Sequence, residues 1–446
     1  MNRMLAQYIL RYLTQLGKIP LWKSFEFLEE SQWWDQKQFR DYQEEKLQKL
    51  LVHSQQNVPF YKTWFLQSGH KPSDISLDNL SLLPAISKAQ LRENLNEFIA
   101  TEYSEPVEEA KTSGSTGVSL HFPKSLKSSA FQLGAMYRGH RWYGVEPGAK
   151  EARLWGIHVN PLSRFKMVTR DILLNRFRER EYNLYPDTLK DFTAKLIRLK
   201  PEYLMGYTSM VAQYAHFLNN TGYDGSIFGL KMVKCTSESI HDDDRAIVEK
   251  VFGCPLVSEY GAAETGLISF QCDHGCNHVM EDCCIVEYVQ PEEPLDDKNL
   301  KEIIVTNLDN FAMPVLRYRV GDFVVPSDRI CHCGRKSGVI EKIVGRVSDI
   351  IRTSDGRQWH SIILYYIMKG LDEKFGGVIQ FKVFQKQVDT LEFFIVPEKK
   401  LPDSALEYVR EKCTESFGPM MHVEFNIVDS IPRESSGKLR DFVSDL

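Results

Sequence analysis

The sequence predicts an α/β protein with a large N-terminal domain and a small α+β C-terminal domain. Apolar residues recur at helical spacing through residues 1–100. Between about residues 110 and 345, short apolar strands alternate with helices and glycine-containing turns, the pattern of an α/β core. After residue 346, three apolar segments (381–385, 391–397 and 423–428) are separated by helical stretches. The expected parts are therefore a helical region over 1–100, a core over 101–346 and an α+β domain over 347–446.

The composition of the 446 residues is that of an ordinary globular protein, with 43% hydrophobic and 26% charged residues. A formal net charge of −5 gives no basic field, so we expect no nucleic acid partner. There is no apolar run of about 18 residues, so we expect no transmembrane segment. Residues 1–22 carry polar side chains throughout and lack the apolar core of a signal peptide. These features predict a cytoplasmic protein.

Two amphipathic helices are expected near the start of the chain. Their spacing is set by Leu5, Ile9, Leu10, Tyr12, Leu13 and Leu16 in the first helix and by Phe39, Tyr42, Leu47, Leu50 and Leu51 in the second. For the first helix we favour packing against the body of the protein, because it has few basic residues and no strongly basic face. Contact with a membrane surface is the alternative.

Three segments of the core are typical of strands that end in polar loops: 230–238, 254–264 and 301–308. In an α/β fold, ligand-binding groups gather at the ends of such strands. A cluster of hydroxyls and glycines at 111–117 adds a loop whose amides and hydroxyls can converge on phosphate. This loop lacks the Gly-Lys-Ser/Thr of a Walker A motif, which argues against a P-loop kinase. A Ser/Gly linker is the alternative.

Residues 258–265 form a second motif, Ser-Glu-Tyr-Gly-Ala-Ala-Glu-Thr. The ring of Tyr260 is suited to stacking on a base, and the Glu264 carboxylate is suited to holding Mg²⁺ against phosphate oxygens. The alternative is an ordinary turn from a strand into a helix, with Glu264 near the helix start. Taken alone, the motif favours neither interpretation.

Two further motifs follow. In the segments 318–322 and 345–349, Asp322 after a glycine at a strand end can accept both hydroxyls of a ribose, and Arg346 can contact phosphate. Near the C-terminal end, Lys438 follows a Ser-Gly turn in the segment 432–440. Such a lysine is usually part of a solvated basic tail, but on a mobile loop it can meet a developing polyphosphate transition state.

The order and spacing of these four motifs resemble the adenylate-forming superfamily of acyl-CoA synthetases. The nearest subgroup is that of the phenylacetate–CoA ligases and the CapK-like proteins of capsule biosynthesis, and the likeness extends over nearly the whole chain, including residues 57–65. The resemblance implies a large domain of parallel sheets with helices and a small β-barrel-like part. It also implies a mobile C-terminal domain that carries the catalytic lysine.

The resemblance also implies roles for single residues, with ATP and Mg²⁺ as cofactors. The catalytic residues would be Lys438, Glu264 and Thr112, with Glu264 as the magnesium ligand. The nucleotide would be bound by Ser113, Gly114, Ser115, Thr116, Gly117, Ser237, Glu238, Ser239, Glu259, Tyr260, Gly261, Asp322 and Arg346. The hinge before the C-terminal domain would be Ser348 or Asp349. The phosphate loop departs from the usual form at Val118 and Ser119, where many members have a Pro-Lys pair.

The cysteines fit the same subgroup. Nine cysteines are present, six of them in two clusters, and close-set cysteines in a cytosolic chain favour a metal over disulfides. The resemblance implies a structural zinc site of Cys272, His278, Cys331 and Cys333, a closed set of four ligands. Competing candidates are Cys276, His274 and His332, while Cys283 and Cys284 are expected to pack in a strand. Free thiols without a metal are the alternative.

The implied reaction joins a carboxylate to AMP and then transfers the acyl group to CoA or to an amine. The carboxylate pocket would include Trp155, His158 and Tyr207, whose polar aromatic rings suit a sugar, although His158 alone is better explained as a core histidine. We expect a sugar-linked or uronic acid of surface polysaccharide, with amide formation; an aryl-acid CoA ligase is the alternative. The non-enzyme alternative is a zinc-stabilised nucleotide-binding scaffold. The oligomeric state is open, with a homodimer as one expectation.

Overall fold

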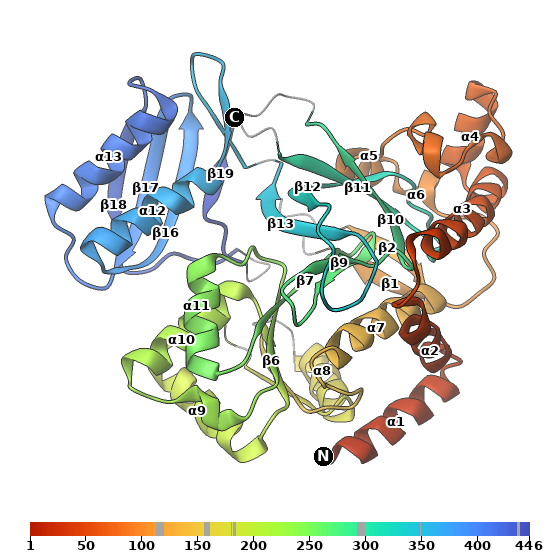
Figure 1. The fold of residues 1–446 in the computed structure, drawn as a ribbon, viewed down its shortest axis with the longest axis horizontal. Helices are drawn as coiled ribbons and strands as arrows, with labels where there is room; N and C mark the ends of the chain where they lie inside the picture. The colour runs from red at the N-terminus through yellow and green to blue at the C-terminus, as the bar shows by residue number, and fades with distance from the viewer. Residues whose placement is uncertain are drawn as a thin grey trace. The chain divides into compact units, whose positions relative to one another are not determined.

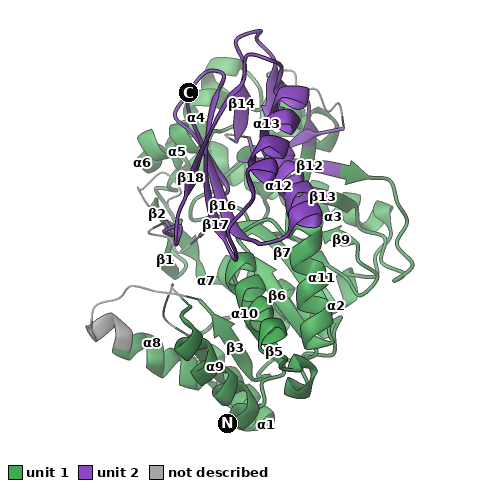
Figure 2. Ribbon diagram, turned by 90° about the vertical axis from the view of Figure 1, so that its left-hand side faces the viewer, with its two compact units in different colours: residues 1–287, 304–320, 326–341 green, residues 288–303, 321–325, 342–446 purple. Residues whose placement is uncertain are grey.

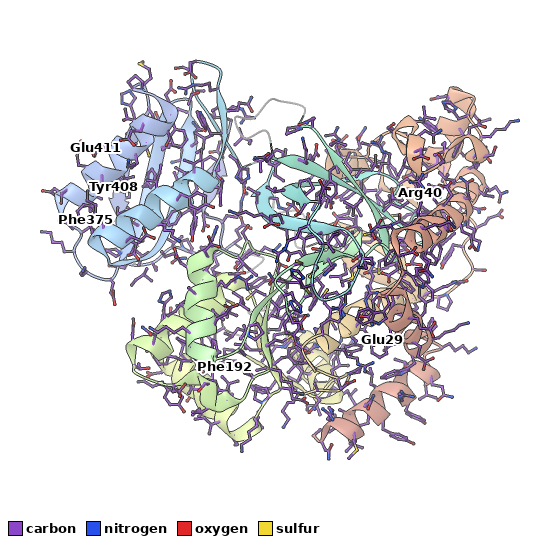
Figure 3. All side chains as sticks on the ribbon, viewed as in Figure 1. Glu29, Arg40, Phe192, Phe375, Tyr408 and Glu411 are labelled. Carbon is purple, nitrogen blue, oxygen red and sulfur yellow. The ribbon has the colours of Figure 1, made fainter. Side chains whose placement is uncertain are left out.

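The computed structural model describes residues 1–112, 120–155, 161–179, 181, 184–291, 299–347, 349–434 and 438–446. The chain divides into two compact units (Figure 2). Unit 1 comprises residues 1–287, 304–320 and 326–341, and unit 2 comprises residues 288–303, 321–325 and 342–446.

Unit 1 begins with a run of helices, as the apolar spacing predicts (Figure 1). The helices are α1 (Arg3–Leu16), α2 (Leu21–Ser31), α3 (Gln36–Asn57), α4 (Pro59–Ser68), α5 (Lys88–Glu93) and α6 (Leu95–Phe98), with 3-10 turns at Pro72–Asp74 and Leu77–Leu82. The start of α3 is fixed by a reciprocal cap, in which the Asp35 side chain accepts from the Gln38 amide at 2.8 Å and Gln38 accepts from the Asp35 amide at 3.0 Å. The buried residues of α3 include Leu47, Leu50 and Leu51. Both predicted amphipathic helices are confirmed.

The central sheet of unit 1 has a parallel part and an antiparallel part. Its strands are β3 (Glu151–Leu154), β4 (Arg176–Glu179), β5 (Tyr203–Gly206), β6 (Met232–Thr236), β7 (Leu256–Ala262), β8 (Gly266–Gln271) and β9 (Asn277–Val279). The order is β4-β3-β5-β6-β7 in parallel, followed by β8 and β9 in antiparallel pairing. The carboxyl ends of β6 and β7 therefore meet at one edge, where Thr236 pairs with Glu259.

Helices cover the parallel strands on both sides (Figure 1). The connecting helices are α7 (Leu126–Arg141), α8 (Pro161–Leu173), α9 (Pro186–Leu199), α10 (Thr208–Asn220) and α11 (Asp242–Phe252), with a 3-10 turn at Gly225–Phe228. Helices α9, α10 and α11 share one apolar core with β3, β5, β6 and β7, and α7 packs in a second core with β5, β7 and β8. A separate hairpin of β1 (Val107–Lys111) and β2 (His121–Ser125) precedes α7.

Beyond β9 the sheet continues through β13 (Val339–Arg346), β12 (Tyr318–Ser327), β11 (Lys301–Asn307) and β10 (Cys284–Val289). The predicted strands at 230–238, 254–264 and 301–308 correspond to β6, β7 and β11. The strand order of the described residues places β10 to β13 in the same sheet, so the barrel-like part stays a prediction. No helix in the described ranges combines the length and apolarity needed to cross a bilayer.

Unit 2 contains the small α+β fold at the C-terminal end of the chain. A hairpin of β14 (Ile350–Arg352) and β15 (Gln358–His360) leads into α12 (Ile362–Phe375), β16 (Val378–Gln387), β17 (Thr390–Pro397), α13 (Asp403–Phe417), β18 (His422–Ile427) and β19 (Phe442–Ser444). The four strands β18-β17-β16-β19 form one sheet, and α12 and α13 share its apolar core. The three strands predicted here correspond to β16, β17 and β18, so the predicted fold class is confirmed; the domain limits of 346 and 347 stay predictions.

Candidate functional site

The phosphate loop begins at the end of β1. Thr112 is buried, its hydroxyl accepts from the Leu120 amide at 3.0 Å, and its own amide donates to the Leu120 carbonyl at 2.9 Å. These two bonds continue the β1–β2 ladder and hold both ends of the loop together. Ser113, Gly114, Ser115, Thr116 and Gly117 lie outside the described residues.

The loop after β6 carries the first residues predicted to flank adenine. Ser237 has a left-handed backbone with φ of 72°, which turns the chain sharply after the strand. The Glu238 carboxylate then accepts from the Ser209 amide at 2.8 Å. Ser209 is the second residue of α10, so this carboxylate satisfies an amide at the positive end of a helix. The bond fixes the loop beside the start of α10, with Ser239 following it.

A buried ion pair supports the next part of the site. The Lys234 side chain on β6 is 0% exposed, and its Nζ lies 2.6 Å from an oxygen of Glu259 on the neighbouring strand β7. Removing a charge from water is costly unless it is paired, so each of the two groups depends on the other. The pair holds β7 immediately before Tyr260, the residue predicted to stack on adenine.

Tyr260 and Gly261 lie at an irregularity between β7 and β8. The pairing register shifts between them, from Tyr260 opposite Ser269 to Gly261 opposite Leu267. A Cβ atom at Gly261 would lie 2.3 Å from the carbonyl oxygen of Gly266, which is backbone and cannot move aside. Only glycine therefore permits this close crossing of the two strands.

Glu264 lies in the turn between β7 and β8. The alternative of a strand-to-helix turn is therefore wrong, because the chain forms a hairpin and no helix follows. The Glu264 carboxylate is buried, accepts from the Tyr318 hydroxyl at 2.8 Å, and lies 3.5 Å from Nζ of Lys88. Both contacts are to Oε1.

Lys88 is a residue that the sequence interpretation missed. It is the first residue of α5, whose N-cap Ser87 accepts from the Gln90 amide at 3.2 Å. Just before this cap, Ile86 forms a parallel bridge with Tyr318, with amide bonds of 2.9 Å in both directions across it. The bridge brings the helical region of the chain to Glu264. No motif marks Lys88, since its partners are far away in the sequence.

Unit 2 holds the predicted ribose-binding pair. Arg346 Nε lies 3.2 Å from Oδ1 of Asp322, and the Val347 amide donates to the Gly321 carbonyl at 2.9 Å. Asp322 lies within β12 and not at a strand end as predicted, because the strand continues through Gly321 despite its φ of 79°. The two side chains predicted to contact ribose and phosphate are therefore adjacent.

The predicted catalytic lysine and hinge also belong to unit 2. The Lys438 carbonyl accepts from the Glu434 amide at 3.0 Å, which closes a short loop near the end of the chain. Arg440 donates to Oδ1 of Asp349 at 2.7 Å, so one of the two hinge candidates is tied to the segment that carries the lysine. Ser348 lies outside the described residues.

The four predicted zinc ligands come together in unit 1. The ligand atoms of Cys272, His278, Cys331 and Cys333 all lie within 4.8 Å of one another. The Cys272 and Cys331 sulfurs are 3.6 Å apart, and the Cys333 sulfur is 3.2 Å from Nε2 of His278. A tetrahedral zinc ion has bonds of about 2.3 Å to sulfur and about 2.05 Å to nitrogen. It therefore places two sulfur ligands about 3.8 Å apart, and a sulfur and a nitrogen ligand about 3.6 Å apart.

Neighbouring residues fix the imidazole of this group and separate the competing candidates. Nδ1 of His278 is bonded to the Ser337 hydroxyl at 3.1 Å, which turns Nε2 toward the cysteines. His274 and His332 are exposed and lie outside the group, whereas Cys276 is buried next to Cys331. Cys283 and Cys284 are buried, and Cys284 opens β10.

The predicted substrate residues are only partly described. The rings of Trp155 and Tyr207 stack with centroids 4.2 Å apart and an angle of 24°. Tyr207 is buried in the core of α9–α11, whereas Trp155 is half-buried after β3. His158 lies outside the described residues. The buried ring of Tyr207 therefore packs against one face of the half-buried Trp155 ring.

Comparisons with known proteins agree with this geometry. The C-terminal residues 351–445 match the family model of the CapK C-terminal domain. Protein CapK of Staphylococcus aureus is 22% identical over 408 residues, which covers 91% of this chain and 89% of that protein. The predicted resemblance to the CapK-like proteins and the phenylacetate–CoA ligases is thereby confirmed. The phenylacetate–coenzyme A ligase of Thermus thermophilus is 25% identical over 338 residues, 70% of this chain and 71% of the ligase.

The fold has solved counterparts among CoA ligases. The crystal structure of 2-hydroxyisobutyryl-CoA ligase in its postadenylation state superposes with a TM-score of 0.71 and 17% identity, covering 93% of this chain and 91% of the ligase. That ligase was crystallised with an acyl-AMP. The predicted fold is therefore confirmed, and the C-terminal part matches the CapK C-terminal domain as expected.

Proposed function

We propose that this protein is an ATP-dependent, AMP-forming ligase that activates a carboxylic acid as an acyl-AMP. The observation that carries the proposal is the buried Glu264 carboxylate beside Lys88, in the hairpin that also bears Tyr260. A buried carboxylate can hold a divalent cation against phosphate oxygens, and an aromatic ring on the same hairpin suits stacking on a base. Relatives named as coenzyme A ligases support the same class of reaction.

The chemistry follows from the poor reactivity of a carboxylate. A substrate carboxylate oxygen attacks the α-phosphorus of ATP, the bond to the bridging oxygen breaks, and pyrophosphate leaves with its electron pair. Negative charge on the phosphoryl oxygens of the transition state must be offset by fixed cations. We assign this role to Lys438 and to the amides and hydroxyls of residues 112–117, with Asp322 and Arg346 holding the ribose.

Mg²⁺ is the metal that this chemistry uses, and it supplies further neutralisation of phosphate charge when bound. The donor set fits, because Glu264 offers a carboxylate and both of its described contacts are to Oε1. Glu264 would therefore be the residue that holds the metal. Lys88, 3.5 Å from the same carboxylate, would compete with the metal for it.

The second half-reaction transfers the acyl group from AMP to a nucleophile. The nucleophile is the thiol of CoA or an amine: the relatives' names support CoA, whereas an amine goes with the polysaccharide substrate proposed below. Lys438 must leave the acyl-AMP before the acceptor can approach, so we assign residues 348–349 to a hinge between the two half-reactions.

For the substrate we propose a sugar-linked or uronic acid of surface polysaccharide, with transfer to an amine. The support is the match to Protein CapK over 91% of the chain and the half-buried ring of Trp155 backed by Tyr207. An aromatic face braced from behind suits stacking on the apolar face of a sugar ring. An aryl acid with CoA as acceptor is the alternative, since the same ring can stack on another ring.

The test is carboxylate-dependent exchange of labelled pyrophosphate into ATP, across aryl acids, fatty acids, amino acids and uronic-acid sugars. We expect exchange with the uronic-acid class and its loss in Lys438→Ala, with ATP binding retained. Exchange only with aryl acids would overturn the substrate assignment and leave the ligase intact. Failure of the wild-type protein to bind ATP would overturn the ligase itself and favour the zinc-stabilised scaffold.

We also propose that Cys272, His278, Cys331 and Cys333 hold one structural Zn²⁺. Support comes from the short separations of their ligand atoms and from the Ser337 bond that orients His278. Four protein ligands leave no position for a substrate, which makes the site structural. Elemental analysis of the purified protein should find one zinc per chain, lost in His278→Ala and kept in the matched variant His332→Ala. Full zinc content in His278→Ala would contradict this ligand set.

A further inference from the structure

Helix α1 leaves its largest apolar side chains in solvent. It packs into unit 1 through the row Ala6, Leu10 and Thr14, of which Ala6 is 1% and Leu10 6% exposed. The parallel row along the helix is Met4, Tyr8, Tyr12 and Leu16, with Met4 72%, Tyr8 68% and Leu16 63% exposed. Residues four apart lie on one stripe of a helix, so this row forms a continuous outward apolar face.

Helix α1 leaves more bulky apolar side chains outside than a helix that only packs on a core would. Its inward row contains one leucine, an alanine and a threonine, whereas the outward row contains a methionine, two tyrosines and a leucine. The inward contact is nonetheless close, because a Cβ atom at Gly148 would lie 2.8 Å from the Gln7 amide nitrogen and 3.1 Å from the Arg3 carbonyl oxygen. The protein therefore holds α1 firmly with its apolar row outside.

The charged side chains that this segment itself carries have one sign, and one of them, Arg3, pairs with Glu202 at 3.5 Å. From residue 1 to residue 25 the only charged side chains are basic: Arg3, Arg11, Lys18 and Lys23. Arg3 and Arg11 lie on a polar row with Gln7 and Gln15, directly beside the apolar row. The Arg11 guanidinium is held 4.2 Å above the ring of Trp22, at the start of α2. The whole chain has a net charge of −5, so the positive charge of this segment is a local feature.

The neighbouring helix α8 repeats the pattern. Its Phe165 and Ile172, seven residues apart and so on one face, are 71% and 64% exposed, with exposed Lys166 and Arg170 on the same helix. Helices α1 and α8 are in contact, and both lie near the N-terminus in Figure 1.

We propose that α1, supported by α8, docks this protein on an anionic phospholipid surface, with Met4, Tyr8, Tyr12 and Leu16 entering the lipid headgroup boundary. Tyrosine rings at the interface and arginines beside an apolar stripe are the features of a helix that lies in the membrane plane. The observed orientation thus favours the membrane interpretation that the sequence alone had ranked second.

A second copy of the chain is the competing occupant, and the charges disfavour it. Two copies joined through α1 would bring arginines and lysines together, with no acidic residue in residues 1–25 to pair with them. The face is also small: a helix about 21 Å long and about 10 Å wide buries roughly 200 Å² per copy, against roughly 800 Å² in a stable interface.

Flotation with phosphatidylcholine vesicles, with and without about 30% phosphatidylglycerol, tests the proposal. The full chain should float with the anionic vesicles only, and more weakly as salt rises. The variant Y8Q/Y12Q/L16Q leaves the inward row intact and should lower the partition coefficient about tenfold or more. Its matched control, L66Q/I227Q/I379Q, removes apolar residues that are equally exposed elsewhere and should float like the wild type.

A second variant keeps the test decisive if the first misfolds. R11Q/K18Q/K23Q should lose the preference for anionic vesicles while retaining the wild-type circular dichroism spectrum. Equal flotation of both variants and the wild type, or no flotation of the wild type, would overturn the proposal. So would sedimentation velocity that finds a wild-type dimer converted to a monomer by Y8Q/Y12Q/L16Q, because the face would then join two copies.

Discussion

Lys88 and Glu264 lie 3.5 Å apart, and the Tyr318 hydroxyl donates to the same carboxylate oxygen at 2.8 Å. The three groups come from the helical region, the β7–β8 turn and β12, all within unit 1. These two contacts fix the position of the Glu264 carboxylate where the proposed function requires a metal ligand.

Replacing Lys88 by methionine should change how the reaction depends on Mg²⁺. The ammonium competes with any second cation at Glu264, so its removal should lower the half-saturating Mg²⁺ concentration by about two- to fivefold, the scale of a partly exposed ion pair. Pyrophosphate exchange at varied Mg²⁺ measures this. Lys62→Met, which alters an exposed lysine of α4, should behave like the wild type. An unchanged Mg²⁺ dependence in Lys88→Met would refute the competition.

Breaking the Lys234–Glu259 pair should destabilise unit 1. Glu259→Gln leaves a fully buried ammonium without its carboxylate, which costs about 3–5 kcal/mol of unfolding free energy. The double variant K234M/E259Q removes both charges and should recover most of that loss. Urea unfolding of the single and double variants checks the coupling. If Glu259→Gln and K234M/E259Q lose the same unfolding free energy, the ion pair is not what stabilises the contact between β6 and β7.

Ser337→Ala should weaken zinc binding without removing a ligand. The hydroxyl orients His278 through Nδ1, and loss of such a partner typically costs about 10–100-fold in metal affinity. Competition with a chromogenic chelator measures the affinity. Ser68→Ala, in the exposed C-terminal turn of α4, provides the control. Wild-type affinity in Ser337→Ala would mean that the imidazole is oriented by other groups.

Glu281 should make stability depend on pH. Burial raises the pKa of Glu281 to about 7, from an ordinary value of 4.5, with Asp282 adding to the rise and the Gly338 backbone opposing it. The folded state favours the protonated form, so this contribution is full below pH 4.5 and is lost as pH rises through about 7. Glu281→Gln should remove this slope and gain roughly 2–3 kcal/mol above pH 7. The unfolding free energies of the wild type and Glu281→Gln are measured between pH 5 and pH 8. If the two depend on pH in the same way, the raised pKa of Glu281 is refuted.

The sequence predicted the elements whose pattern is local. The apolar segments at 230–238 and 254–264 became β6 and β7, since an apolar run bounded by polar loops is enough to indicate a buried strand. The four zinc candidates also met in space, because two of them share a Cys-His-Cys turn and the other two flank a tight turn before β9. For such features, spacing along the chain already limits the geometry.

Features that depend on distant pairing could not be predicted. Lys88 reaches Glu264 only through the bridge between Ile86 and Tyr318, and no local pattern marks that bridge. Glu264 was equally compatible with a helix start, because the apolar run of β8 can form either element until its pairing with β7 is known. The outward orientation of α1 likewise depends on what the helix packs against, which a periodic pattern alone does not specify.

An AMP-forming ligase cleaves ATP between its α- and β-phosphates. ³¹P NMR of the products tests this, with an acid that supports pyrophosphate exchange and with inorganic pyrophosphatase absent. We expect AMP and pyrophosphate in equal amounts, formed only when the acid is present and lost in Lys438→Ala. Accumulation of ADP and phosphate as the primary products would contradict it, because that outcome requires attack at the γ-phosphorus.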